Sequence, residues 1–570
     1  MRLQISESKN AASFYVVKST YENGKHSSKV VEKLGTLKEL TEKLNGQDPF
    51  EWANEYAAEL TRQEKEAKRN VLVKHSPSKQ IPKNKQRTFN GGYLFLQKIY
   101  HELGLDKICR AISDTYKFEF DLDCILSRLL YGRIIFPSSK LSTYEQSKTF
   151  LEPPNFELHH IYRGLEVLAK EQAFIQSELY KNSMKITNRN TDLLYYDCTN
   201  YFFEIEQEEG LKQYAKSKEN RPNPVVQMGL FMDGDGFPLA FNITEGNTNE
   251  QVTLRPLEEK ILSDFELSRF VVCTDAGLSS YANRKFNNVG GRSFITTQSL
   301  KTLKDHVKKW ALDPKDWRCP GGTKYFDISE LDEEMYKDTT FYKETWIKEN
   351  DLEQRLIVSY SLKYRNYQRK IRASQIERAL KAIENNPTKV KKTSQNDYKR
   401  FIQKTNVTSD GEVAEHQIFT INQDAISSEE IYDGFYGVCT NLENNLLDII
   451  KANHRRWEIE ESFRIMKSEF KARPVYLKRD NRIKAHFATC FIALMIHRML
   501  EKKLGEKHTA HEIIDGLRNM SFIKVKGEGY EPIYIRDDFT DHLHEAFGFR
   551  TDYEIVNHAQ MKNIFQITKK

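Results

Sequence analysis

The chain has 570 residues, 39% of them hydrophobic, and a net charge of +6. This length and composition support a large core and predict two to four domains rather than one. The seven cysteines include no C-x-x-C pair, which argues against a zinc ribbon or a disulfide framework and favours a reduced, cytoplasmic setting. The N-terminus has no apolar signal core, and the longest apolar run, 487–496, is too short for a membrane span of about 20 residues, so no membrane partner is expected.

The positive charge is concentrated in two stretches. Residues 62–87 carry nine Lys or Arg against two Glu, and residues 363–400 carry twelve against three acidic residues. Such blocks suit contacts with phosphate groups, although a run of charge is more often a solvated face. The pattern alone leaves both interpretations open.

Three segments are expected before residue 189. Residues 1–75 predict a β-hairpin, with a turn at Asn23-Gly24, followed by a helix. Residues 76–92 form a basic linker interrupted by proline and glycine. Residues 93–188 repeat apolar side chains at spacings of three and four, which predicts a mainly helical region.

The pattern changes to strands in residues 189–299. A strand-like aromatic run, a hairpin around the turn Asp233 to Gly236, a helix, a strand, a short helix and another strand follow in order. Three antiparallel strands followed by parallel additions are the order of a ribonuclease-H-like core, and this assignment is an analogy with a known fold.

The last helix of such a core does not come next. Residues 300–432 instead alternate strand-like pieces with a long basic helix, and we interpret them as a β-rich insertion domain, because loops of that length are uncommon without structure of their own. Residues 433–505 would then complete the core, and residues 506–570 form a C-terminal region.

Two aspartates lie in or directly after strand-like runs. Asp197 lies within "LLYYDCTNYF", where strand interiors disfavour aspartate and burial of a bare charge is costly. Asp275 ends "FVVCTDAG", at the carboxyl end of a strand, where open α/β sheets place their sites. Each could instead be structural, Asp197 facing water on an edge strand and Asp275 capping a turn. Carboxylates on converging rigid elements are also what a pair of divalent metal ions needs.

The segment "HRRWEIEESFRIMKSEF" predicts a helix with a mixed charged surface. An apolar stripe spans about 60° of arc and comprises Ile459, Phe463, Met466 and Phe470. Arg456, Glu460 and Lys467 lie within about 40° of one another on a row that flanks this stripe. Ordinary pairing between charges four residues apart would explain the row equally well. Trp457 is expected to pack in the core, with stacking on an unpaired base as the alternative.

In combination these residues resemble a known family. Asp197 in "YYDCTNYFFE", Asp275 in "VVCTDAGLSS" and Glu460 in "RRWEIEESFRIMK" are similar to the DDE triad of bacterial insertion-sequence transposases, in the cut-and-paste superfamily typified by insertion sequence four. The resemblance covers about residues 190 to 500, with matching context around each motif.

That superfamily carries the signature Tyr-x2-Arg-x3-Glu-x6-Lys. Arg456, Glu460 and Lys467 fit its spacing, whereas the tyrosine position is occupied by Asn453. This departure puts one DNA contact in doubt and leaves the metal ligands unaffected.

The resemblance implies an α/β fold: a ribonuclease-H-like catalytic core interrupted by a β-rich insertion domain and preceded by a mainly helical DNA-binding region with a small N-terminal β module. The triad would hold two Mg²⁺ or Mn²⁺ ions and cut at the terminal inverted repeats, and the freed 3′ hydroxyl would join target DNA. Four residues would contact double-stranded DNA beside the cut: Arg456, Lys467, Asn453 and Trp457. A homodimer in the bacterial cytoplasm is expected, because two element ends must be brought together.

Two other functions stay open. The chain could be a catalytically silent DNA-binding regulator derived from a transposase, for which Asn453 is the only hint. It could also be a ribonuclease-H-like nuclease without strand transfer, although the insertion and the basic N-terminal region favour transposition.

Overall fold

The computed structural model describes residues 1–8, 11–22, 25–44, 46–67, 70–73, 76–215, 221–385, 397–407 and 416–570. The chain divides into two compact units, residues 1–85 with 525–528, and residues 86–524 with 529–570. The first unit is built on a three-stranded sheet, and the second contains a ten-stranded sheet and most of the helices.

In the first unit an antiparallel sheet packs against two helices. Its elements are β1 (Arg2–Ser8), β2 (Ala11–Glu22), β3 (Lys25–Thr36), α1 (Leu37–Lys43) and α2 (Pro49–Ala67). β2 and β3 form the hairpin that the sequence predicts, and the turn pair Asn23-Gly24 lies outside the described residues. β1, which the sequence analysis did not identify, pairs with β2. The core of the unit is centred on Phe14, Leu40 and Ala53.

The second unit contains a sheet of order β11-β10-β12-β13-β16-β9-β8-β5-β6-β7. Its strands are β5 (Leu193–Phe202), β6 (Val225–Asp233), β7 (Pro238–Glu245), β8 (Val271–Thr274), β9 (Ser293–Gln298), β10 (Trp317–Arg318), β11 (Tyr325–Phe326), β12 (Thr340–Glu349), β13 (Leu352–Ser361) and β16 (Phe435–Thr440). β5, β6 and β7 are antiparallel neighbours, whereas β8 joins β5, and β9 joins β8, in parallel. The predicted succession of three antiparallel strands and two parallel strands is therefore present.

β5 is covered on both faces because alternate side chains of a strand point to opposite sides. Leu194, Tyr196 and Cys198 belong to a core cluster with residues of α9 (Glu250–Asp264). Tyr195 and Tyr201 belong instead to the main core, together with apolar side chains of α15 (Trp457–Ser468). Two shorter helices complete the surroundings of the sheet: α10 (Tyr281–Phe286) and α14 (Leu446–His454).

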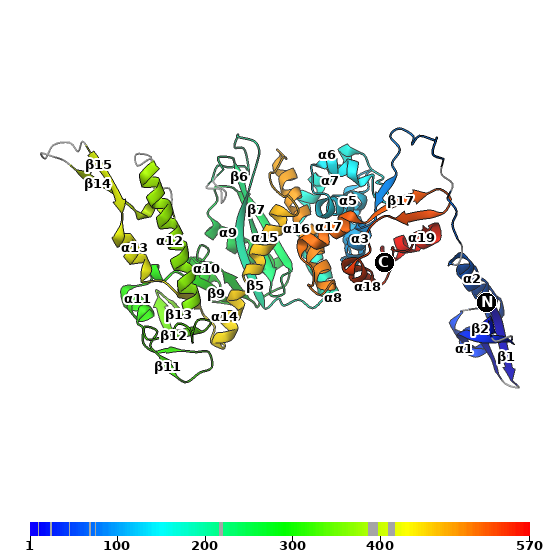
Figure 1. Ribbon diagram of the computed structural model, residues 1–570, viewed down its shortest axis with the longest axis horizontal. Helices are drawn as coiled ribbons and strands as arrows, with labels where there is room; N and C mark the ends of the chain where they lie inside the picture. The colour runs from blue at the N-terminus through cyan, green and yellow to red at the C-terminus, as the bar shows by residue number, and fades with distance from the viewer. Residues whose placement is uncertain are drawn as a thin grey trace. The chain divides into compact units, whose positions relative to one another are not determined.

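Most of the insertion's strands extend the core sheet (Figure 1). β13 pairs with β16, which in turn pairs with β9, so β10 to β13 continue the core sheet beyond its parallel strands. β14 and β15 form a separate two-stranded sheet. The remaining elements of this segment are η1 (Leu300–Thr302), α11 (Asp305–Leu312), α12 (Leu362–Asn385), η3 (Tyr398–Phe401), β14 (Ile402–Val407), β15 (His416–Ile421) and α13 (Gln423–Glu430).

Helices from both ends of the second unit form one body. They are α3 (Tyr93–Glu102), α4 (Leu105–Tyr116), α5 (Leu122–Ile135), α6 (Lys140–Ser147), α7 (Leu158–Lys170), α8 (Gln172–Ile186), α16 (Asp480–Lys503), α17 (Ala510–Asn519), α18 (Asp538–Phe547) and α19 (His558–Ile567). A small sheet accompanies them, of β4 (Thr88–Asn90), β17 (Ser521–Val525), β18 (Gly529–Pro532) and β19 (Val556–Asn557). The Asn90 amide donates to the Leu517 carbonyl at 3.0 Å. The C-terminal region therefore packs with the helices that begin at residue 93.

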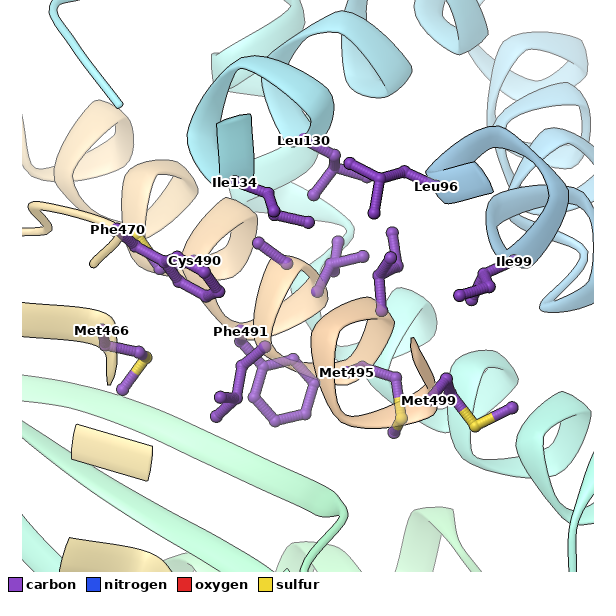
Figure 2. Close-up of a cluster of buried hydrophobic side chains, with 14 of the residues drawn as sticks. Leu96, Ile99, Leu130, Ile134, Met466, Phe470, Cys490, Phe491, Met495 and Met499 are labelled. Carbon is purple, nitrogen blue, oxygen red and sulfur yellow. The ribbon is translucent and has the colours of Figure 1, made fainter. Parts of the chain in front are cut away.

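α16 forms the centre of this body (Figure 2). Its Cys490, Phe491 and Met495 lie between residues of α3 and α5, such as Leu96 and Leu130, and residues at the end of α15. Met466 and Phe470 are both fully buried in this cluster. All four residues of the predicted apolar stripe are 0 to 4% exposed: Ile459, Phe463, Met466 and Phe470. The stripe thus fixes α15 on α16.

α16 has the length and composition of a helix that could cross a membrane, with a mean hydropathy of 1.3 over 18 residues. Within the protein, however, 94% of that window is buried. A helix that is apolar all round is expected at the centre of a large protein as well as in a membrane. The packing in Figure 2 assigns α16 to the protein core.

Candidate active site

Asp197 and Asp275 lie on neighbouring parallel strands. β5 and β8 pair with Leu193 opposite Val271 and Tyr195 opposite Cys273. Continuing this register by two positions places Asp197 opposite Asp275, which follows the last residue of β8. Side chains two positions apart share a face, and neighbouring strands are about 4.8 Å apart. The two aspartates therefore lie side by side on the face that carries Tyr195.

Each aspartate also makes a local backbone contact. Oδ1 of Asp197 accepts the N–H of Cys198 at 2.8 Å, and Oδ1 of Asp275 accepts the N–H of Leu278 at 3.0 Å. Asp275 therefore caps the turn that follows β8, as the structural alternative for this residue anticipates. A carboxylate has two oxygens with several acceptor positions, so this contact leaves Oδ2 of Asp275 available as a ligand.

α15 lies over the same face of β5. The Lys467 ammonium donates to the Thr199 hydroxyl and lies 5.5 Å from the centre of the Tyr201 ring. Thr199 and Tyr201 alternate with Asp197 along the strand and share its face. The C-terminal end of α15 is thereby positioned over the strand that carries the first aspartate.

The N-terminal end of α15 lies near the second aspartate. Burial opposes the charge of Arg456, but Tyr436, Asp275, Cys273 and Glu460 together raise the pKa of its guanidinium. Within the described residues its Nε is buried and has no hydrogen-bond partner. The site therefore contains a buried donor that an anionic oxygen could satisfy.

Glu460 lies between these two ends of the helix but is not drawn into a cluster with the aspartates. Its carboxylate is 61% exposed, and Oε1 lies 3.8 Å from Nη1 of Arg456. Among the residues that the structure describes, no three His, Cys, Asp or Glu side chains are grouped closely enough to hold a metal ion. The extended register thus directs Asp197 and Asp275 to one face of neighbouring strands, and Glu460 lies on the adjoining helix, paired with Arg456.

Asn453 is buried, with 7% of its surface exposed. Its amide donates to the Tyr436 hydroxyl at 3.2 Å, and its Oδ1 lies 3.9 Å from the Cys273 sulfur. The assignment of Asn453 as a DNA contact is not tested by this position and stays a prediction. Its observed contacts are with the protein interior.

Trp457 is 61% exposed, so the expectation that it packs in the core is wrong. The reason is helical geometry, because Trp457 projects about 160° away from Ile459 at the centre of the buried stripe. An aromatic surface is therefore presented to solvent directly beside Arg456.

Tyr436 of β16 is a site residue that the sequence analysis missed. Its hydroxyl lies 2.7 Å from that of Thr297 and accepts the hydrogen bond from Asn453. The strand β16 was recognised from the sequence. Its pairing with β9, however, joins segments far apart in the chain, and this pairing sets Tyr436 beside Asn453 of α14. Strand alternation alone gives no signal for that contact.

A cavity of about 800 Å³ opens next to the second aspartate. Ala276 and Ser279, from the turn after β8, line one side of it. The insertion supplies the other side, including Trp310 and Trp346. Aromatic, cationic and amide side chains around one cavity suit a polar ligand with flat apolar faces.

Sequence comparison matches residues 202–496 to the family described as the transposase DDE domain. Asp275 and Glu460 lie inside this segment, and Asp197 lies five residues before it. No curated protein matches the chain.

Two solved structures show a weak similarity. A piggyBac transposase synaptic complex with hairpin DNA has a TM-score of 0.36 and 8% identity, covering 85% of this chain and 86% of that one. A Mos1 transposase paired-end complex has a TM-score of 0.13 and 12% identity, covering 40% and 63%. At these TM-scores neither similarity supports an argument about fold or function.

Proposed function

The chain belongs to the transposase DDE-domain family, and from this we propose that it is an active cut-and-paste transposase of an insertion sequence. It would cleave DNA at the element's terminal inverted repeats and join the freed ends to target DNA. The observation that supports the proposal most is the parallel pairing of β5 with β8, the two neighbouring strands that lead to Asp197 and Asp275, with α15 packed over β5.

Asp197, Asp275 and Glu460 are the proposed ligands of two Mg²⁺ or Mn²⁺ ions. The donor set fits, because these hard cations prefer carboxylate oxygens and proteins supply only a few of them. When bound, a pair of such ions activates the attacking oxygen and stabilises the leaving oxygen. Glu460 would complete the set by giving up its contact with Arg456 and binding the metal ions instead. An ion pair at the surface is worth at most about 1 kcal/mol, so breaking it costs little.

Arg456 and Lys467 would hold the phosphate groups beside the cut. Arg456 has a buried, unsatisfied Nε close to Asp275, and a phosphate oxygen is a fitting acceptor for it. Fixed cations near the reacting phosphate neutralise charge that grows in the transition state. Released from Glu460, the Arg456 guanidinium would also offer its outer nitrogens to the same phosphate.

Trp457 would stack on a base that is unpaired near the cut. Its exposure leaves the indole face accessible beside the cation that binds the phosphate. The fit of Arg456, Glu460 and Lys467 to the spacing Arg-x3-Glu-x6-Lys supports membership of the insertion-sequence-four superfamily. We also propose a bacterial, cytoplasmic homodimer, because both element ends must be held for cutting and joining.

The test is a cleavage assay on DNA that carries the inverted repeats flanking the gene, with Mg²⁺ supplied. Asp197→Asn, Asp275→Asn and Glu460→Gln should each slow cutting by about 10³-fold or more, while a gel shift of the same DNA, without metal, is unchanged. Normal cleavage by all three variants would refute the triad. Adding target DNA and detecting joined products separates a transposase from a nuclease without strand transfer.

A second candidate is a catalytically silent DNA-binding regulator. Two observations favour it: Asn453 takes the place of a signature tyrosine, and Glu460 is paired with Arg456 rather than gathered with the aspartates. A protein that shifts the DNA but never cuts it, with Mg²⁺ or Mn²⁺ present, would support this candidate over the transposase.

A further inference from the structure

One edge of β12 is almost entirely unpaired. The opposite edge pairs with β13 along the whole strand, from Thr340 to Glu349. On the open edge β10 pairs only at Tyr342. Among the described residues, no other segment bonds to the backbone of residues 343–349 on that side. Such an edge presents a row of free N–H and C=O groups to which a further strand could bond.

The register of the sheet decides which residues of β12 face this open edge. Ser361 of β13 donates its N–H to Gly434 at 3.1 Å, on the side of β16. Successive residues of a strand direct their backbone groups to alternate sides, so Tyr360 faces β12, where Phe341 is its partner. Every second residue of β12 from Phe341 onward therefore bonds to β13. The outward residues are the intervening ones: Glu344, Trp346 and Lys348.

The space beside the outward residues is open. Trp346 is 46% exposed, and Lys348 is exposed and forms no ion pair with any described residue. Arg355 donates to Oε2 of Glu344 at 3.0 Å, and a carboxylate has a second oxygen for another partner. The cavity of about 800 Å³ is lined by residues 345–349, so it runs alongside this part of the strand. A further strand would have both room and bonding groups here.

The sequence of the open edge is self-complementary in one antiparallel register. When Trp346 lies opposite Trp346 of the partner subunit, Glu344 lies opposite Lys348 of the partner subunit, and Lys348 opposite Glu344 of the partner subunit. A shift by one pair places a charged residue opposite tryptophan and leaves one outward residue without a partner. The register that joins opposite charges is therefore also the one in which every outward residue pairs.

We propose that the open edge of β12 is the interface between two copies of this chain, which pair antiparallel about a twofold axis. This inference rests on the homodimer of the proposed function and names the surface that forms it. Directly opposite outward residues would exchange two N–H···O bonds, so the sheet of one copy would continue into that of the other. A twofold contact uses the same patch on both subunits, which is the symmetry that the charges of this edge have.

Charge order is what favours a second copy over another occupant. Charged side chains on an edge strand usually prevent pairing between copies. On β12, however, the one negative and the one positive outward residue lie at equal distances from Trp346, so antiparallel pairing turns repulsion into attraction. An extended peptide of another protein would bond to the same backbone groups. It would need the same order of charges, which a second copy supplies by symmetry.

The interface would also affect the candidate active site. Trp346 and Lys348 line the cavity together with Ala276 and Ser279, which belong to the turn after Asp275. A strand of the partner subunit along this edge would therefore form an additional wall of the cavity beside the second aspartate. Pairing of two copies would in this way enclose the space next to the candidate site.

The experiment is sedimentation velocity of the full chain without DNA. One pair of strands buries less than the standard interface of about 1,600 Å², so concentrations from about 1 to 100 μM are suitable. The unmodified chain should change from monomer to dimer across this range. Lys348→Glu should raise the dissociation constant about tenfold or more, because like charges then meet at both ends of the pairing. Glu344→Lys should have the same effect with the opposite sign of charge.

A mixture of these two variants is the sharpest test of the register. In a mixed pair, each negative outward residue of one variant lies opposite a positive one of the other. The equimolar mixture should therefore dimerise as the unmodified chain does, although neither variant associates with itself. Misfolding of a variant cannot produce this result, because a misfolded chain would not regain its affinity on mixing.

Lys181→Glu on α8 is the matched control. Lys181 is 46% exposed and is paired with Glu178 at 3.1 Å, so this variant reverses one surface charge away from β12. Its dissociation constant should equal that of the unmodified chain. Far-ultraviolet circular dichroism should be the same for all three variants, because none of the substituted side chains is fully buried.

The outcomes separate this inference from the proposed function. A chain that stays monomeric at every concentration, or variants that dimerise normally, would refute the interface whether or not the chain cuts DNA. Variants that stay monomeric both alone and when mixed would also refute it, because the register requires their association. A chain that dimerises as expected but neither binds nor cuts DNA would refute the proposed function and retain the interface.

Discussion

α15 and α12 are both crowded with charge, but they are attached to the protein in different ways. α15 is held by an apolar stripe, and Ile459 and Met466 are fully buried. α12 buries an ion pair between Arg372 and Asp433 beside a few apolar side chains such as Ala379. On α15 the cations flank the buried face near the strands that lead to the aspartates, whereas on α12 the buried cation serves the fold.

The difference shows that the number of charges on a helix does not identify its function. A cation is a candidate for chemistry or binding when it is buried, has a donor atom without a hydrogen-bond partner and lies near a carboxylate of the candidate site. By that criterion Arg456 is a functional candidate, whereas Arg372 serves the fold. Four substitutions test the comparison between the two helices.

The largest effect is expected for Glu460→Gln on α15. Cleavage should fall by about 10³-fold, the upper end of what removing one electrostatic contact to a transition state costs. The control is Glu461→Gln, one residue later on the same helix. Glu461 pairs with Arg464 on the outer side, so this variant should cleave normally. Equal losses of cleavage in Glu460→Gln and Glu461→Gln would mean that the negative charge of α15, and not the position of Glu460, supports cleavage.

On α12 the corresponding experiment is Arg372→Met. Asp433 would be left buried with only Arg369, whose Nε is 3.7 Å away, and the local cost should be about 3 kcal/mol. Hydrogen exchange of the α12 amides should therefore quicken by about 100-fold.

The double variant Arg372→Met with Asp433→Leu tests whether the buried ion pair only anchors α12 or has a further role. Replacing both partners of a buried pair by apolar side chains of similar size is often neutral, so slow exchange should return. Exchange that stays fast in the double variant would contradict a purely structural role for this pair.

Much of the core could be predicted from the sequence, because local patterns determine it. The apolar runs of β5 to β9 and the 3.6-residue period of α15 are visible without partners. Pairing between distant segments is not visible in this way. The sequence indicated strands near 355 and 435 but not that β13 joins β16, and it contained no reason to pack Phe95 against Phe549, whose rings stack at 4.8 Å.

In the candidate site, too, some features could be predicted from local sequence and others depend on pairing between distant segments. Asp197 and Asp275 could be selected because carboxylates are unusual in strands, but their adjacency depends on a register that only the paired sheet supplies. Tyr436 was missed because its contact with Asn453 crosses from β16 to α14. The exposure of Trp457, by contrast, follows from helical geometry that the sequence already contained.

An intermediate effect is expected for Arg456→Ala. Loss of a guanidinium beside the reacting phosphate should slow cleavage by about 10²-fold. Because Arg456 is only partly buried, the thermal unfolding midpoint should change little. Arg456→Lys should restore part of the rate but not the geometry of two parallel hydrogen bonds. A rate loss matched by a large drop in the unfolding midpoint would instead make Arg456 structural, like Arg372.

The smallest effect is expected for Trp457→Ala, which tests whether the exposed side of α15 takes part in binding. A buried tryptophan would cost about 3–5 kcal/mol of stability when truncated, but Trp457 is 61% exposed and its loss should leave the unfolding midpoint unchanged. Stacking on one base contributes about 1–3 kcal/mol, so binding to a DNA end with unpaired bases should weaken by about tenfold. Binding to a fully paired duplex should not change, because its bases are stacked on one another. Equal binding of both DNAs by Trp457→Ala and the unmodified chain would leave the indole without a role in DNA recognition.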